Sequence, residues 1–337
     1  MKQRKRLLVF VIGIAISVVF LGLAFSNLDF STFAENLKRV QVGWLLVGPV
    51  VYSAAVTVIA LRWQFLLRSI QFVPLRQLTV LVTIGYMGNN VYPFRAGEAL
   101  RIFLLRRNYG VPVGKATTTV IVERAFDGLV MLSFIFIALL FVNVQSSEIR
   151  TVATFAAPVF LSAMIIFFAL AARPNLLRRL ALLVSRIVPG RIGDLVAHLS
   201  EEIIGGLEGL RSPADLAGTI ISSFVTWAIE ASVYWIVTFA FDLQVSYAVV
   251  LLVVGTINLA GLIPSTPGQL GVYEFFASTV MIAAGVPNEL AVAYAIVVHV
   301  VIWVPVTLTG FIFLIRQGLG WTAITHAQEL EAKVAAG

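Results

Sequence analysis

The sequence predicts an all-α protein that crosses a membrane several times, and two observations support this prediction. Of the 337 residues, 59% are apolar and 12% are charged, about half the roughly 25% charged share of a soluble domain. Several uncharged runs also reach the length of about 20 residues that a helix needs to cross the hydrocarbon core. This composition excludes an ordinary soluble enzyme and a disordered chain.

Six segments have the length and apolar content of full transmembrane helices. They cover residues 7–25, 42–61, 116–142, 152–172, 216–241 and 290–315. The first follows a basic cluster at residues 2–6, and no small-residue cleavage motif comes after it. We therefore expect a retained transmembrane helix here and not a signal peptide.

Two further apolar segments, residues 78–105 and 248–284, are interrupted by proline and glycine. Proline breaks a helix, and basic residues flank both ends of the first segment, so this segment is predicted to enter and leave on the same side. We expect two re-entrant hairpins of short half-helices; two short full spans are the alternative. The residues expected to form and gate the breaks are Asn89, Pro93, Gly97, Asn258, Pro264, Pro267, Gly268 and Gly271.

The order of span, span, broken segment and span occurs twice along the chain. One unit covers residues 1–143 and the other 151–317, and the number of crossings gives them opposite orientations. The sequence therefore predicts an inverted-topology repeat within a single membrane domain, residues 1–317, followed by a short cytoplasmic tail, residues 318–337. Interrupted segments at corresponding positions of two halves are the best sequence indication of a transporter's binding site.

The net charge of +7 is interpreted as an orientation signal, so no nucleic-acid partner is expected. Basic residues, including Arg62 and Arg68 at the end of the second span, place both termini in the cytoplasm of a cell-membrane protein. Residues 173–211 form an Arg-rich amphipathic connector on the cytoplasmic side. We expect this connector to contact anionic lipid headgroups; a solvated link between the two halves is the alternative.

Ionisable residues within the predicted membrane segments are the candidate site. They are Arg95, Glu98, Glu123, Arg124, Asp127, Glu230 and Glu274. If all seven side chains faced lipid, their insertion would cost on the order of 20 kcal/mol in total. They must therefore face protein, water or each other. Glu123 and Asp127 share a helix face at i, i+4 and repel each other unless a cation such as Arg95 or Arg101 intervenes. We expect a polar cavity lined by both signs of charge; pairing that only holds helices together is the alternative, and it is equally supported for Glu230.

Catalytic, metal and cofactor sites are not predicted. The chain has no Cys, and its three His residues are widely spaced, which argues against zinc and redox chemistry. His299 has no carboxylate partner nearby in the sequence and is expected to be a hydrogen-bonded interior residue. No Walker motif occurs, so direct use of ATP is not expected.

Three strings carry a resemblance to a known family: residues 93–98 (PFRAGE), 123–127 (ERAFD) and 264–274 (PSTPGQLGVYE). In this order they resemble the lysylphosphatidylglycerol synthase transmembrane-region family, also called the flippase-like domain family. The resemblance implies a membrane domain that moves a phospholipid or lipid-linked headgroup between leaflets. The soluble synthase domain of studied members is missing here, so translocation without synthesis is expected.

The same resemblance suggests roles for the charged residues. We expect Arg95, Arg101 and Arg124 to contact the lipid phosphate, because a guanidinium group suits bidentate phosphate binding. The residues expected to balance those charges, or to hold a cationic headgroup, are Glu98, Glu123, Asp127 and Glu274. Two alternatives stay open. One is an integral-membrane lipid-modifying enzyme, for which no His–carboxylate pair or metal motif is recognisable; the other is a non-catalytic membrane partner of a lipid-synthesising enzyme, docked at residues 173–211.

Overall fold

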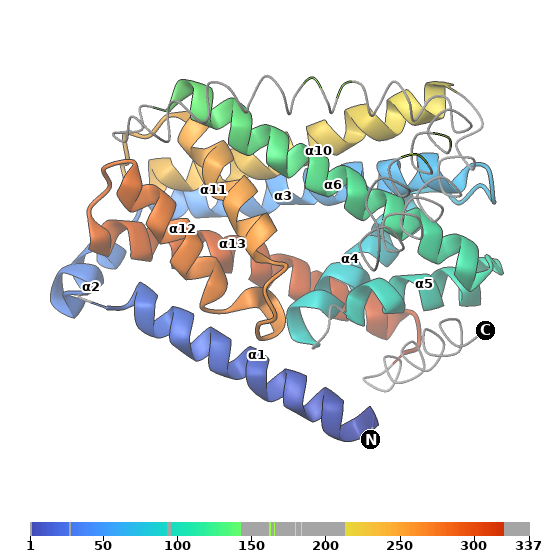
Figure 1. Cartoon of the computed structure of the whole chain (residues 1–337), viewed down its shortest axis with the longest axis horizontal. Coiled ribbons are helices and arrows are strands. Elements are labelled where there is room, and N and C mark those ends of the chain that lie inside the picture. Colours follow the sequence, from blue (N-terminus) through green and yellow to red (C-terminus); the bar gives the residue numbers. More distant parts are fainter. Residues whose placement is uncertain are drawn as a thin grey trace.

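The computed structural model describes residues 2–26, 28–92, 96–142 and 213–319, together with four isolated positions between 162 and 183. Within these ranges the chain forms helices and turns and no strand, which confirms the predicted all-α class. The elements in chain order (Figure 1) are α1 (Lys2–Ala24), α2 (Phe30–Lys38), α3 (Val42–Leu67), α4 (Leu75–Val91), α5 (Ala96–Tyr109), α6 (Val113–Phe141), α10 (Pro213–Ala240), α11 (Tyr247–Ala260), the short 3₁₀ helix η2 (Pro267–Gln269), α12 (Val272–Ala283) and α13 (Asn288–Arg316).

Within the described ranges, four helices are long and apolar enough to cross a membrane, namely α3, α6, α10 and α13. They confirm the spans predicted at residues 42–61, 116–142, 216–241 and 290–315. The span predicted at residues 7–25 falls on α1, whose described apolar part, Val11–Ala24, is shorter than a full span. The span predicted at 152–172, nearly all of the connector at 173–211 and residues 320–337 lie outside the described residues.

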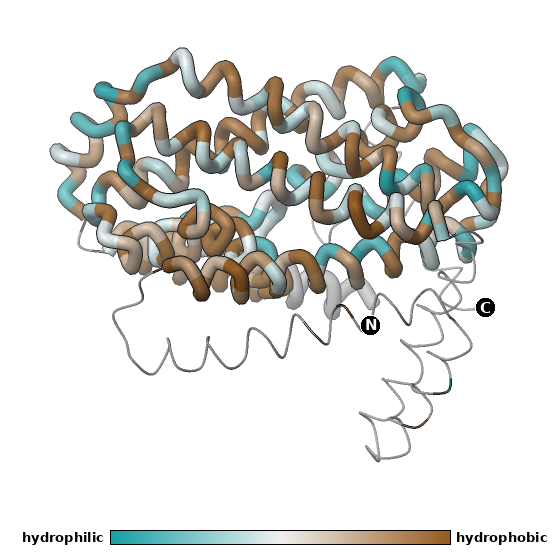
Figure 2. Tube along the Cα trace, turned by 90° about the horizontal axis from the view of Figure 1, so that it is seen from above, coloured by the Kyte–Doolittle hydropathy of each residue, from teal (hydrophilic) through white to brown (hydrophobic). Residues whose placement is uncertain are grey.

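The outer surface of the helices is apolar. Large aliphatic side chains such as Leu46 and Val50 are each 70% exposed, and Figure 2 shows hydrophobic residues along the helices, with hydrophilic residues gathered mainly at their two ends. An apolar surface of this extent is unfavourable in water and suits contact with lipid. The exterior therefore agrees with a membrane protein.

Each interrupted segment forms a pair of packed helices: α4 with α5, called hairpin 1, and α11 with α12, called hairpin 2. With 12 to 17 residues each, these helices are about 18–26 Å long, less than the roughly 30 Å of a hydrocarbon core. The pairing in hairpin 1 depends on glycine, because a Cβ atom on Gly97 would lie 1.8 Å from the carbonyl oxygen of Gly85.

The long helices and the hairpins pack reciprocally. Helix α3 lies against α10, α6 packs against α11, and α13 packs against α4. The last long helix of each half therefore contacts the first helix of the other half's hairpin. This arrangement brings the breaks of the two hairpins together, and η2 of hairpin 2 contacts α4 of hairpin 1.

Helix α1 lies along one side of the molecule (Figure 1) and packs against α12. The hydroxyl of Ser17 accepts a hydrogen bond from the backbone N–H of Thr266, at 3.0 Å. Gly271, which has a φ of 87°, packs so closely on α1 that a Cβ atom would lie 2.3 Å from the carbonyl oxygen of Ser17. Helix α1 thus covers the break of hairpin 2.

Candidate functional site

A buried cluster of ion pairs is centred on Glu123 of α6. Its Oε1 atom accepts from the guanidinium groups of Arg101 at 2.9 Å and Arg124 at 2.6 Å, and it forms an ion pair with Arg62 at 3.3 Å. Asp127, one turn later on α6, contacts Arg62 at 2.5 Å and Arg124 at 3.4 Å. Arg62 and Arg124 therefore both lie between the two carboxylates and offset their repulsion, while Arg101 neutralises Glu123.

Arg62 corrects one prediction. The sequence placed this residue at the cytoplasmic end of the second span, because the uncharged run stops at residue 61. In the structure α3 continues to Leu67, and Arg62 is 1% exposed inside the cluster. Arg62 is the first charged residue after a long apolar run, and such a residue typically lies at the membrane surface. Its partner Asp127 is 65 residues away in the sequence, so the sequence did not indicate the ion pair.

Glu98 completes the cluster, because its Oε1 atom lies 3.6 Å from Nε of Arg124. Three arginines thus face three carboxylates, and their formal charges cancel. The guanidinium of Arg101 also lies over the ring of Trp63, 4.7 Å from its centroid, a cation–π contact that stabilises the buried charge. Arg95, expected to take part, lies outside the described residues, as does Pro93.

A cavity of about 490 Å³ lies next to the cluster, where the breaks of the two hairpins meet. Helices α3, α4, α6, α10, α11 and α13 and the turn before α12 all contribute to its wall. Of the cluster, only Arg124 lines the cavity; Glu98, Arg101, Glu123 and Asp127 do not. Arg124 therefore connects the buried charges with the cavity.

Five of the eight residues predicted to form the hairpin breaks line this cavity, whereas Gly97 and Gly271 do not. Asn89, Asn258, Pro264, Pro267 and Gly268 line it. The side-chain oxygen of Asn89 also accepts the backbone N–H of Gly97, at 3.0 Å, and so satisfies a free donor at the start of α5. The sequence thus correctly located the segments that meet here, although their gating role is not tested by this geometry.

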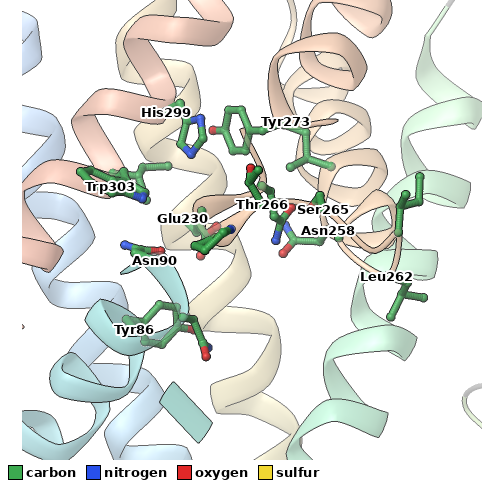
Figure 3. Close-up of a pocket in the computed structure, with 18 of the residues that line it drawn as sticks. Tyr86, Asn90, Glu230, Asn258, Leu262, Ser265, Thr266, Tyr273, His299 and Trp303 are labelled. Carbon is green, nitrogen blue, oxygen red and sulfur yellow. The ribbon is translucent and has the colours of Figure 1, made fainter. Parts of the chain in front are cut away.

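Asn90 and Trp303 form one wall of the cavity, and Ser265 and Thr266 lie opposite them, as Figure 3 shows. The amide of Asn90 donates to the hydroxyl of Thr307 on α13, at 2.9 Å, which ties the end of α4 to that helix. Gly268, with a φ of 70°, allows hairpin 2 to approach Trp303, whose Nε1 would lie 2.6 Å from a Cβ atom.

Glu274 and His299 form a second pair at the cavity. His299 lines the cavity, and its Nδ1 atom lies 2.5 Å from Oε1 of Glu274. The other oxygen of Glu274 accepts the backbone N–H of Gly271, at 2.6 Å, and so caps α12. His299 is hydrogen-bonded in the interior, and its partner Glu274 was not recognisable in the sequence because the two residues lie on different helices, 25 residues apart.

Glu230 of α10 also lines the cavity and is 7% exposed. Its carboxyl group makes no hydrogen bond or ion pair with any residue that the structure describes. Aromatic residues that the sequence analysis did not single out surround the same space: Tyr52, Tyr86, Tyr92, Trp227, Tyr234, Tyr273 and Trp303. They come from α3, α4 and its C-cap, α10, α12 and α13, so no pattern within one segment indicated that all of them share one wall.

Comparison with known proteins gives one family match and several relatives. The family model described as "Lysylphosphatidylglycerol synthase TM region" matches residues 10–310. The UPF0104 membrane protein PH1989 of Pyrococcus horikoshii is 22% identical over 337 residues, which cover 94% of this chain and 98% of that protein. A UPF0104 membrane protein of Methanothermobacter thermautotrophicus is 24% identical, over 80% of this chain and 83% of that protein.

A further relative carries an enzyme's name. The protein called Glycosyltransferase AglD, from Haloferax volcanii, is 25% identical over 320 residues, which cover 85% of this chain. These residues are 50% of that protein, so the chain spans about half of its length.

Proposed function

We propose, from the premise that this chain belongs to the lysylphosphatidylglycerol synthase transmembrane-region family, that it is a membrane lipid translocase. It moves a phospholipid or lipid-linked headgroup between leaflets through the cavity next to Arg124, and it needs no catalytic residue or cofactor of its own. The observation that carries this proposal is the polar cavity among apolar helices, at the meeting point of the two hairpin breaks. A headgroup that leaves water requires such fixed polar groups to replace its hydration.

An inverted-topology repeat is part of this proposal. Residues 1–143 and 151–317 are its two units within one membrane domain, and hairpins 1 and 2 are re-entrant from opposite sides. Two facts support it: the hairpin helices are too short to cross the hydrocarbon core, and α13 packs on α4 as α6 packs on α11. Two related halves around a central site would let the cavity open to either side in turn.

Arg124 is the proposed contact for the lipid phosphate, because its side chain is 32% exposed and lines the cavity. Arg101 is 3% exposed and bound to Glu123, so it would reach a phosphate only after the cluster opens. Glu98, Glu123 and Asp127 balance Arg124, and Glu274 holds His299 in the wall. We keep Arg95 as a proposed phosphate contact on sequence alone.

The proposed location is the cell membrane, with both termini in the cytoplasm. The connector, residues 173–211, would lie on the cytoplasmic surface and contact anionic lipid headgroups. The tail, residues 318–337, would lie on the same side.

A second candidate function is that of a membrane partner for a lipid-modifying enzyme, or of such an enzyme itself. The match to half of a protein named as a glycosyltransferase favours the partner role, because the other half of that protein lies outside the match. The Glu274–His299 pair favours the enzyme role, because a His–carboxylate pair is a common acid–base arrangement.

The decisive test is lipid transfer by the purified full chain in vesicles of phosphatidylcholine and phosphatidylglycerol. Fluorescent phosphatidylglycerol would report transfer as the fraction that a membrane-impermeant quencher reaches. We expect transfer with the wild type, loss with Ser265→Trp, which fills the cavity, and no change with Arg39→Gln, whose side chain is 80% exposed. Equal transfer by the wild type and Ser265→Trp would overturn the cavity as the route, and no transfer by the wild type would contradict translocation of this lipid.

A further inference from the structure

The buried carboxyl groups of the described helices differ in their partners. Four are less than 9% exposed: Glu123, Asp127, Glu230 and Glu274. Glu123 and Asp127 each contact two or more arginines, and Glu274 contacts His299 and the N–H of Gly271. Among the residues that the structure describes, Glu230 alone of the four has no hydrogen bond or ion pair.

The described groups that face Glu230 provide no free cation. The titratable groups that face it are Asp127 of α6, Tyr52 of α3, Tyr86 of α4, Tyr234 of α10 and Tyr273 of α12. All of these are neutral or acidic side chains, so none of them can neutralise a carboxylate.

The two basic side chains that the described residues contribute to this cavity are already paired. Arg124 contacts Glu98, Glu123 and Asp127, and His299 contacts Glu274. An ionised carboxylate without a cation is costly at membrane depth, and carboxyl groups in this situation mark proton pathways in membrane transporters.

We propose that Glu230 is a proton-binding residue that couples lipid transfer to a pH gradient. This inference rests on the proposed translocase function. The Glu230 carboxylate takes one proton from the side to which the cavity is open and becomes a neutral carboxylic acid. After the cavity opens to the other side, the O–H bond breaks and the same proton leaves to water there, which restores the carboxylate. No other reactant is consumed.

Proton binding can be tested without any transport, by infrared difference spectra of the purified full chain in lipid. We would compare spectra at several values between about pH 6 and about pH 9, a range in which an exposed carboxyl group is almost fully ionised. The expected result is a band from a protonated carboxyl group without hydrogen bonds that is lost in Glu230→Gln. Glu35→Gln, the same change at a side chain that is 67% exposed, should keep this band. A wild-type spectrum without a Glu230-dependent band would overturn the proton site.

Coupling is then tested in the vesicles used for lipid transfer, with a gradient of one pH unit, which is a tenfold ratio of proton activity. Wild type and Glu35→Gln should change their transfer rate by up to about tenfold, and Glu230→Gln should transfer at the same rate with and without the gradient. If the wild type transfers lipid at the same rate with and without the gradient, the coupling proposal is wrong, even though the translocase function stands. If the wild type transfers nothing, the translocase function fails for this lipid, and the infrared spectra still decide whether Glu230 binds a proton. Thermal unfolding would verify that all variants are folded.

Discussion

Arg124 and His299 occupy equivalent positions in two helices of equal length. Each lies eleven residues after the first residue of a 29-residue helix, α6 for Arg124 and α13 for His299, and both helices follow a proline. Each also contacts a glutamate in the first turn of the preceding hairpin helix, Glu98 of α5 at 3.6 Å and Glu274 of α12 at 2.5 Å. The two halves thus present one acid–base pair each to the same region, which supports the proposed repeat.

Opposite orientation of the hairpins predicts where thiol reagents will react. The chain has no native Cys, so single Cys residues can be placed at exposed ends of hairpin 1, Gln71→Cys and Asn108→Cys, and of hairpin 2, Gln244→Cys and Ala283→Cys. In intact cells, a membrane-impermeant reagent should label both hairpin 2 positions and neither hairpin 1 position. After the cells are opened, all four should react. If the two ends of one hairpin label from different sides, that segment crosses the membrane and is not re-entrant.

Gly97→Ala should disrupt hairpin 1. The added Cβ atom would lie 1.8 Å from the carbonyl oxygen of Gly85, and a contact this short forces the two helices apart, at a cost of about 1–3 kcal/mol or more. Gly114→Ala is the matched control, because no atom lies within 4 Å of its Cβ position. We expect a lower unfolding temperature for Gly97→Ala only; equal temperatures for the two variants would contradict the close packing of hairpin 1.

Arg62→Ala should destabilise the protein strongly. It leaves Asp127 and Glu123 buried with one arginine fewer, and removal of one partner from a buried ion pair costs about 3–5 kcal/mol. The control is Arg68→Ala, which breaks the partly exposed pair with Asp215 and should cost at most about 1 kcal/mol. Thermal unfolding of both purified variants measures the difference, and a loss no larger for Arg62 than for Arg68 would rule out the cluster as a stabilising element.

Whether the protein changes the covalent structure of lipids distinguishes a translocase from an enzyme that uses the Glu274–His299 pair. A translocase should leave the masses of all lipids unchanged when the wild type is incubated with a membrane lipid extract. Mass spectrometry of that extract is the measurement. A new lipid mass that appears with the wild type and disappears with His299→Gln would instead assign acid–base catalysis to the pair.

Asp29 lies outside the spans, and its side chain is expected to make the stability of α2 depend on pH. Hydrogen bonds from the Ser31 hydroxyl, and then from the backbone N–H groups of Ser31 and Thr32, lower the pKa of the Asp29 side chain to about 2. Because the folded-state pKa is lowered, the cap stabilises α2 above the ordinary carboxyl pKa, and this contribution is lost as the pH falls through about 2. The protection of the first amides of α2 against hydrogen exchange should therefore not depend on pH near neutrality, and these amides should exchange faster in Asp29→Ala at the same pH. Equal exchange in that variant would show that Asp29 does not cap the helix.

Hydropathy predicted the four long helices because each contains an apolar run of sufficient length, and proline and glycine located the two breaks. Contacts between distant segments were not accessible in this way. Arg62 pairs with Asp127 across 65 residues, and Glu274 pairs with His299 across 25 residues. Each partner sits on a different helix, so only the packing of those helices places the charges together. The sequence did indicate the repulsion of Glu123 and Asp127 from their spacing along one helix, and it named Arg101, which contacts Glu123, as a cation that could offset this repulsion.

The ion cluster has a consequence for synthesis of the chain, because its six charged members all lie between residues 62 and 127. Among the described residues, the second half adds two neutral groups to it: the indole N–H of Trp227 donates to Asp127, and the hydroxyl of Ser223 accepts from Arg62. The charges can therefore neutralise each other while the ribosome is still producing the second half. Since chains fold from the N-terminus first during synthesis, the first half can insert into the bilayer with these six charges already neutralised. The helices that complete the cavity are added afterwards.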